Sequence, residues 1–185
     1  VLDSINWMAI RQKAMNINQM VTKLGRFYRV GLSGGKDIIK IGAELEHVKV
    51  YLEIQKLRFD NKIILILEGL DSIKDNCIPK LTLQKKKKNA IMHGIVSKEQ
   101  QKGVIKIKKK KKNNKIIIKV KDNGIGIDED DINKIMKKPE GNRGFGLKNI
   151  DERIKIYFGE KYGLEFNRSE KYNTIIEIRL PVERK

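Results

Sequence analysis

An α+β fold is predicted by this sequence: a two-layer α/β sandwich with a mixed sheet, preceded by a helical hairpin. Apolar residues in the first 60 positions recur at helical spacing, whereas the rest of the chain alternates short β-rich apolar runs with helical segments. Strands and helices mixed in this way favour helices packed on one face of a sheet. We therefore expect a helical region over residues 1–60 and a separate α/β domain over residues 61–185.

The first 60 residues are expected to form two helices. Residues 1 to about 32 contain an apolar series at i, i+3, i+4 and i+7, which predicts one buried helix face. That series is Ile17, Met20, Val21 and Leu24. A glycine- and serine-containing segment at 31–35 ends the pattern, and a second helix is expected from about Ala43 to Phe59. We expect its apolar side to be Leu45, Val48 and Leu52, with the outer positions Glu44, Glu46, Lys49 and Glu53.

From Ile63 onward the sequence predicts strands and helices in alternation. Five strands are expected, at 63–67, 104–110, 115–121, 162–167 and 174–180. Asn113-Asn114 is a hairpin turn signal between the second and the third. Helices are expected after Ile78-Pro79 to about residue 92, at 128–138, and from 146 to about 158. Together these elements form the expected sandwich.

The composition excludes several classes of protein. No run of about 18 apolar residues is present, so no transmembrane helix is expected. The single cysteine, Cys77, forms no internal disulfide and fits a reducing cytoplasm. The formal net charge is +18, but nine of the lysines lie in the runs 85–88 and 108–112. Neither run has interleaved aromatic residues for base stacking, so we expect no nucleic-acid partner.

Asp122-Asn123-Gly124-Ile125-Gly126 follows the expected strand 115–121 directly. An aspartate at a strand end, followed by two glycines, directs a carboxylate into a cleft while the backbone bends tightly. Such a carboxylate is a good acceptor for an exocyclic amine such as that of adenine. The same residues are also ordinary turn formers, so this motif alone leaves a nucleotide contact and a plain turn open.

Two further motifs lie next to expected helices. The segment 144–147, Gly-Phe-Gly-Leu, opens a helix, where free N–H groups and the helix dipole favour phosphate; a flexible loop is the alternative. Asn89 and His93 share one helix face, and an amide oxygen there can bind a metal ion. For His93 a helix-terminal electrostatic role is favoured. The sequence contains neither a Walker A motif nor a dinucleotide fingerprint.

Taken in order, these motifs resemble the ATPase superfamily shared by gyrase, a heat-shock chaperone, the mismatch-repair protein MutL and histidine kinases. The matching series is Asn89-Ala90, Asp122-x-Gly-x-Gly, Gly144-x-Gly-Leu-x-Asn149 and Asn173-Thr174. The flanking segments 44–48, 51–55 and 58–59 resemble the linker of a membrane sensor kinase subfamily whose phosphoacceptor lies in a His-Phe-x-x-Asn motif. Residues 2–7 resemble the segment after that motif. The resemblance covers nearly the whole chain and implies the histidine-kinase-type ATPase fold.

The resemblance implies a role for each matching residue in binding ATP and Mg²⁺. Asp122 would hold the adenine amino group, with Gly124 and Gly126 letting the backbone wrap the nucleotide. Asn89 would coordinate Mg²⁺ against the phosphates. The other nucleotide-binding positions would be Arg143, Gly144, Gly146, Leu147 and Thr174. Residues 128–143 would form a lid over ATP, and Lys148 and Asn149 lie close enough in sequence to line the phosphate end.

Two departures from the family pattern have consequences. The only histidines, His47 and His93, lie outside a His-Phe-x-x-Asn context, so we expect a fragment that begins beyond the acceptor and does not autophosphorylate alone. Lys85–Lys88 replace the family's Pro-Leu-Val-Glu, which puts Lys88 at the position of the acid-base glutamate. A protonated lysine is not a base, and four consecutive helical lysines direct at least one toward the core. An altered stretch of sequence and a divergent kinase are the two interpretations.

The predicted function is that of a histidine protein kinase, which transfers the ATP γ-phosphoryl to a histidine outside this fragment for relay to a response regulator. By resemblance, the intact protein would be a homodimer held in the bacterial membrane only by upstream segments, with this domain in the cytoplasm. The alternative is a degenerate, non-catalytic ATP-binding or dimerisation module, which Lys88 favours. A gyrase- or chaperone-like machine would need a transducer domain, which the end of the chain soon after Pro181 argues against.

Overall fold

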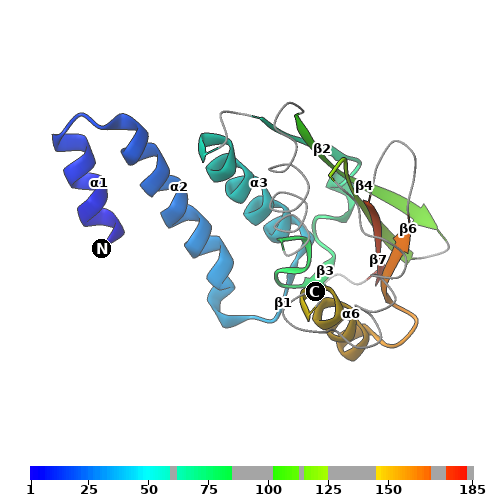
Figure 1. The fold of residues 1–185 in the computed structure, drawn as a ribbon. Coiled ribbons are helices and arrows are strands. Elements are labelled where there is room, and N and C mark those ends of the chain that lie inside the picture. The colour runs from blue at the N-terminus through cyan, green and yellow to red at the C-terminus, as the bar shows by residue number, and fades with distance from the viewer. Residues whose placement is uncertain (59–61, 85–101, 113–114, 125–144, 168–173, 183–185) are drawn as a thin grey trace.

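The computed structural model describes most of the chain: residues 1–58, 62–84, 102–112, 115–124, 145–167 and 174–182. Helices at the N-terminal end are followed by a five-stranded sheet that carries helices on one face (Figure 1). This arrangement confirms the predicted α+β sandwich with a mixed sheet behind a helical region.

The N-terminal region contains two helices where the sequence predicted one. Helix α1 (Leu2–Arg11) and helix α2 (Met15–Leu32) pack against each other, and Lys13 takes a positive φ of 55° in the turn between them. The predicted buried face of α2 is covered only in part. Val21 is buried, but Ile17 is exposed.

Helix α3 (Ile41–Arg58) lies between α2 and the sheet (Figure 1). Leu45, Val48 and Leu52 are buried, as predicted. The expectation that Glu44 lies outside is wrong: its side chain is buried, and so is that of His47, which stacks on Phe27 of α2. An amphipathic reading assumes one covered face, but α3 contacts α2 as well as the α/β domain, so it is buried on more than one face.

Two short strands join the linker between α2 and α3 to the α/β domain. After the 3-10 turn η1 (Ser33–Gly35), strand β1 (Ile38–Lys40) pairs antiparallel with β3 (Cys77–Pro79). The sequence predicted only a glycine-containing link here. Each strand has three residues, and the partner lies about 40 positions away, so local sequence carries little signal for this ladder.

All five strands predicted for the main sheet are present, with small changes at their ends. They are β2 (Ile63–Glu68), β4 (Gly103–Lys112), β5 (Lys115–Asp122), β6 (Gly163–Asn167) and β7 (Thr174–Pro181). Their order is β2-β4-β5-β7-β6, with β2 parallel to β4 and the other pairs antiparallel. The 3-10 turn η2 (Asp71–Ile73) was not predicted.

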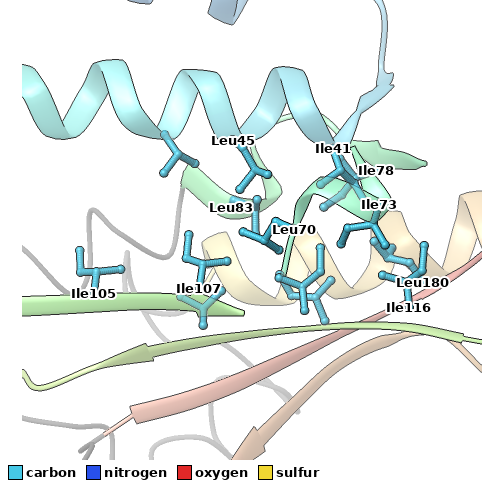
Figure 2. Close-up of a cluster of buried hydrophobic side chains, with 14 of the residues drawn as sticks. Ile41, Leu45, Leu70, Ile73, Ile78, Leu83, Ile105, Ile107, Ile116 and Leu180 are labelled. Atoms are coloured by element: carbon cyan, nitrogen blue, oxygen red, sulfur yellow. The ribbon is translucent and has the colours of Figure 1, made fainter. Parts of the chain in front are cut away.

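The core lies between this sheet and helices α3 and α6 (Phe145–Phe158). Alternate residues of the central strands, such as Ile105 and Ile107, point to the helix side. In Figure 2 these side chains point from the sheet toward α3, which carries Leu45, and Leu70 and Leu83 lie between the two layers. The helix predicted after residue 146 is confirmed by α6, which ends at Phe158 as expected.

The opposite face of the sheet is rich in lysine. Strand β4 continues to Lys112, two residues beyond its predicted end at residue 110. Lys106 pairs with Glu68, and Lys119 pairs with Glu177, across neighbouring strands. Burial lowers the pKa of Lys121, and the charges of neighbouring lysines lower it further. The predicted turn at 113–114 lies outside the described residues.

Candidate functional site

Asp122 and Thr174 come together where the neighbouring strands β5 and β7 end and begin, at one end of the sheet's interior strands. Asp122 is the last residue of β5, Thr174 is the first of β7, and the strand register pairs them directly. Strand alternation places Asp122 on the same face as Ile118 and Val120, which belong to the core. The aspartate therefore stands on the helix side of the sheet, where the apolar core gives way to a polar edge.

The Asp122 carboxylate also closes the turn that follows it. Its Oδ1 accepts a hydrogen bond of 3.1 Å from the backbone N–H of Gly124, and Gly124 is buried. This contact confirms the turn interpretation of the motif. It does not exclude the nucleotide contact, because an ionised carboxylate has two oxygens with about four acceptor positions. The turn and an amine donor can thus use the same side chain.

Asn123 was not predicted as a site residue, yet it holds the motif in place. Its Oδ1 accepts the N–H of Val104 at 2.7 Å, and its Nδ2 donates to the carbonyl of Lys102 at 3.0 Å. Its own N–H donates to the carbonyl of Val104 at 3.3 Å. The side-chain amide therefore continues the β4–β5 ladder for one step beyond the end of β5. Asparagine in a turn is common, and nothing local in the sequence identifies the partner strand.

The first turn of α6 carries the second glycine motif. Gly146 and Leu147 lie in this turn, Leu147 is buried, and the helix packs on β6 and β7. The first N–H groups of a helix lack acceptors within the helix, and its dipole favours an anion at this end. Of the weaker candidates, Lys148 lies 3.8 Å from Glu152 and Asn149 is exposed.

α6 is fixed to the sheet by Asp151. This buried aspartate accepts the N–H of Leu164 at 2.7 Å and lies 2.7 Å from the ammonium group of Lys155. The hydrogen bond from Lys155 to the carboxylate raises the pKa of Lys155. The contact joins the helix that begins with the glycine motif to edge strand β6.

A helical segment begins at Thr82 and leads toward the predicted magnesium ligand. Residues 82–84 are helical, and Glu44 accepts hydrogen bonds from backbone N–H groups at its start. The predicted helix after Pro79 is thus confirmed at its beginning. Asn89 itself lies outside the described residues, as do Lys88, Gly126, Arg143, Gly144, the segment 128–143 and His93.

The structure therefore brings together Asp122, Gly124 and Thr174, and places Gly146 and Leu147 on a helix that packs against β7. In the ranges given above, no three metal-ligating side chains cluster together. None of the helices described is both long and apolar enough to cross a membrane. The described groups suit an adenine nucleotide: a carboxylate at a strand end, a buried glycine turn and a helix N-terminus.

Comparison with known proteins assigns the family. Residues 82–184, more than half of the chain, match the family of histidine kinase-, DNA gyrase B- and HSP90-like ATPases, and residues 1–63 match the histidine kinase family. The chain belongs to the histidine kinase-, DNA gyrase B- and HSP90-like ATPases. The resemblance inferred from the motifs is thus confirmed, and ATP is the nucleotide of this family. The His-Phe-x-x-Asn context of the acceptor stays a prediction.

The relatives of this ATPase-family chain include sensor kinases. The sensor histidine kinase YesM of Bacillus subtilis is 38% identical over 97% of the chain, and YpdA of Escherichia coli is 33% identical over 95%. The chain spans 30% of the length of each. The catalytic domain of histidine kinase ThkA has a TM-score of 0.56 at 19% identity, covering 80% of this chain and 97% of that one. Acinetobacter baumannii AdeS has a TM-score of 0.55 at 17% identity, covering 95% and 85%. These two structures share the fold.

Proposed function

We propose that residues 61–185 are the ATP-binding catalytic domain of a sensor histidine kinase and that residues 1–60 are part of its helical dimerisation and phosphoacceptor region. The observation that carries the proposal is the pairing of Asp122 with Thr174 beside a buried glycine turn, in a chain of this ATPase family. The sequence relatives named as sensor histidine kinases support it.

The proposed adenine contacts lie at the end of strand β5. Asp122 accepts the adenine amino group while its Oδ1 keeps the turn at Gly124 closed. Asn123 keeps this turn against β4, so the carboxylate is held before the nucleotide arrives. Gly126 and Thr174 complete the adenine side.

The proposed phosphate side combines two helix starts. Gly146 and Leu147, with Gly144 and Arg143, meet the phosphates at the beginning of α6. Asn89 holds Mg²⁺ through its amide oxygen, and Mg²⁺ supplies neutralisation of charge on the phosphates. Lys88 stands at the acid-base position, where a cation can neutralise phosphate charge but cannot accept a proton.

The phosphoryl acceptor is proposed to be a histidine outside residues 1–185. His47 does not suit this role, because its side chain is only 3% exposed and its ring stacks on Phe27 at 4.4 Å between centroids. An acceptor must reach the γ-phosphate, and a ring packed between two helices cannot. His47 is instead part of the packing between α2 and α3.

The proposed partners of the intact protein are a response regulator and a second copy of the chain. A crystal structure of histidine kinase ThkA in complex with response regulator TrrA supports the first. Exposed apolar side chains on α1 and α2, such as Trp7 at 60% and Leu32, support a helical homodimer. We further propose that segments upstream of this chain anchor the protein in the bacterial membrane, with this domain on the cytoplasmic side.

Calorimetric titration with Mg-ATP tests the nucleotide site. The parent chain is expected to bind saturably, and Asp122→Asn to bind about 10- to 100-fold more weakly, because a hydrogen bond to a charged group contributes about 1.5–3 kcal/mol. Asp71→Asn makes the same chemical change at an exposed side chain and is the matched control. Equal affinity of Asp122→Asn and parent would refute the adenine contact.

A degenerate ATP-binding module is the second candidate, and Lys88 favours it. Both candidates predict ATP binding, so a transfer assay separates them. The chain is mixed with radiolabelled ATP and an acceptor fragment that carries the missing histidine, and acid-labile phosphate on the fragment is counted. Label on the acceptor supports the kinase, and binding without label supports the degenerate module.

A further inference from the structure

Glu44 belongs to α3, yet its carboxylate contacts the α/β domain. It is 1% exposed. Its Oε2 accepts the N–H of Leu81 at 3.0 Å, and its Oε1 accepts the N–H of Leu83 at 2.9 Å and of Gln84 at 3.3 Å. One side chain therefore binds three backbone donors that lie 37 to 40 positions further along the chain.

These three donors surround the start of the helix that begins at Thr82. The first N–H groups of a helix have no acceptors within the helix, and a neighbouring Ser, Thr or Asp usually supplies one. The Thr82 hydroxyl instead donates to the carbonyl of Pro79 at 2.5 Å. Glu44 provides the capping acceptors, and its negative charge also suits the positive end of the helix dipole.

The same helix turn is packed as well as capped. Leu83 is fully buried and lies between α3 and the sheet (Figure 2). Its N–H is bound by Glu44, while its side chain joins the core that contains Leu45. Two adjacent residues of α3 thus hold the backbone and the side chain of one helical residue.

A second contact ties α6 to the linker. Arg153 of α6 donates from Nη1 to the carbonyl of Lys80 at 3.1 Å and from Nη2 to the carbonyl of Asp37 at 3.5 Å. Lys80 and Asp37 are themselves joined, by a backbone hydrogen bond of 2.9 Å and an ion pair of 3.3 Å. The linker therefore contacts α6 and the residue that lies just before the helix beginning at Thr82.

We propose that Glu44 is a positioning residue through which α3 holds the start of the helix that the sequence predicts to lead to Asn89, and that this contact is needed for full Mg-ATP affinity. This inference rests on the proposed function. The sequence predicts a helix on which Asn89 follows Gln84 by five residues, so we expect a shift of the capped turn to weaken the proposed contact of Asn89 with Mg²⁺. The adenine contact at Asp122 lies at the end of β5 and does not depend on this turn.

Glu44→Gln is the variant that tests the proposal. It keeps the size of the side chain but replaces one acceptor oxygen with an NH₂ group, which faces backbone donors. Glu53→Gln is the matched control, because Glu53 also lies on α3 but pairs with Lys23 of α2 and is 42% exposed. Glu44→Asp keeps the charge and withdraws it by one methylene, and replaces Glu44→Gln if thermal unfolding shows that Glu44→Gln is not folded.

Amide hydrogen exchange measures the helix start without any ligand. Exchange at Leu83 and Gln84 is expected to be about tenfold faster in Glu44→Gln than in the parent, which corresponds to the loss of about one charged hydrogen bond. Exchange in strand β7 is expected to be unchanged. Glu53→Gln is expected to match the parent at both places. Equal exchange in Glu44→Gln and parent overturns the proposal.

Nucleotide titration measures what the Glu44 contact contributes to Mg-ATP binding. With Mg²⁺, Glu44→Gln is expected to bind ATP about tenfold more weakly than the parent. In EDTA the two are expected to bind ATP equally, because that affinity depends on the Asp122 side. An equal loss with and without Mg²⁺ indicates a merely structural role and overturns the proposal. A parent that binds no ATP refutes the proposed function and with it the contribution of Glu44 to Mg-ATP binding, while exchange still reports whether Glu44 holds the helix start.

Discussion

Replacing Gly163 with alanine tests how α6 is held against the sheet. Gly163 has φ of +139°, which a residue with a Cβ rarely adopts. A Cβ built there lies 2.4 Å from Oδ1 of Asp151, and that same oxygen accepts the N–H of Leu164 at 2.7 Å. The substitution therefore strains the backbone and displaces the carboxylate that binds the next residue.

Both effects can be given a magnitude. Backbone strain of this kind costs about 1–3 kcal/mol, and loss of a hydrogen bond to a buried charged group costs about 1.5–3 kcal/mol. We expect Gly163→Ala to lower the free energy of unfolding by about 2.5–6 kcal/mol. Gly159→Ala is the matched control, because Gly159 has φ of +96° but nothing within 4 Å of a built Cβ. Gly159→Ala should lower the free energy of unfolding only by the cost of the backbone strain.

Urea unfolding followed by far-UV circular dichroism gives both free energies, and equal m-values show that the unfolded states are comparable. The double variant Gly163→Ala/Asp151→Ala locates the clash. If alanine at 163 collides with Asp151, the double variant loses less than the two single variants together, because one of the colliding groups is gone. Strict additivity, or equal costs at positions 163 and 159, would show that the collision with Asp151 is not the cause.

Two further outcomes are expected. Asn123→Ala should lower the free energy of unfolding by about 1–3 kcal/mol, because the N–H of Val104 and the carbonyl of Lys102 both lose a partner. It should also weaken ATP binding, whereas the exposed control Asn16→Ala on α2 should not. Unchanged unfolding of Asn123→Ala in urea would contradict this. The pKa of Lys155 is raised above its ordinary value of 10.5, so its pairing stabilises the fold fully below about pH 10 and the contribution is lost as pH rises through the raised pKa. Lys155→Met should therefore lower the free energy of unfolding at pH 7, by less than about 1 kcal/mol because solvent screens the pair. It should also reduce the loss of stability that we expect in melting curves of the parent as pH rises above about 10.

The parts of the fold that were predictable depend on contacts between neighbours in sequence. In β4, Ile105 and Ile107 alternate with lysines, and this alternation predicts both the strand and its buried face. Helix α6 ends directly before Gly159, and glycine is usual just after the last residue of a helix. The break between α1 and α2 has no such marker, since neither glycine nor proline occurs at 12–14 and Lys13 adopts the positive φ.

The candidate site, too, was predictable from the sequence only in part. Asp122 and Thr174 were predicted to belong to one site, and their pairing follows once β5 and β7 are neighbours. The turn at Gly124 is local and was also predicted as one of two readings. The β1–β3 ladder was missed because two three-residue strands become visible only when the linker folds back onto the α/β domain.

Glu44, Asn123 and Arg153 were all missed as supports of the site, and they share one kind of contact. Each is a polar side chain that binds backbone groups of an element distant in sequence: 37 positions for Glu44 to Leu81, 19 for Asn123 to Val104 and 73 for Arg153 to Lys80. Every residue has the same backbone groups, so no sequence motif can predict which of them a distant side chain will bind. A residue that binds a ligand can be found by its chemistry and spacing, whereas a residue that binds the backbone beneath the site is found only in the structure. Glu44 lies on α3 and Arg153 binds the linker, so two of these three supports connect the N-terminal helical region to the α/β domain.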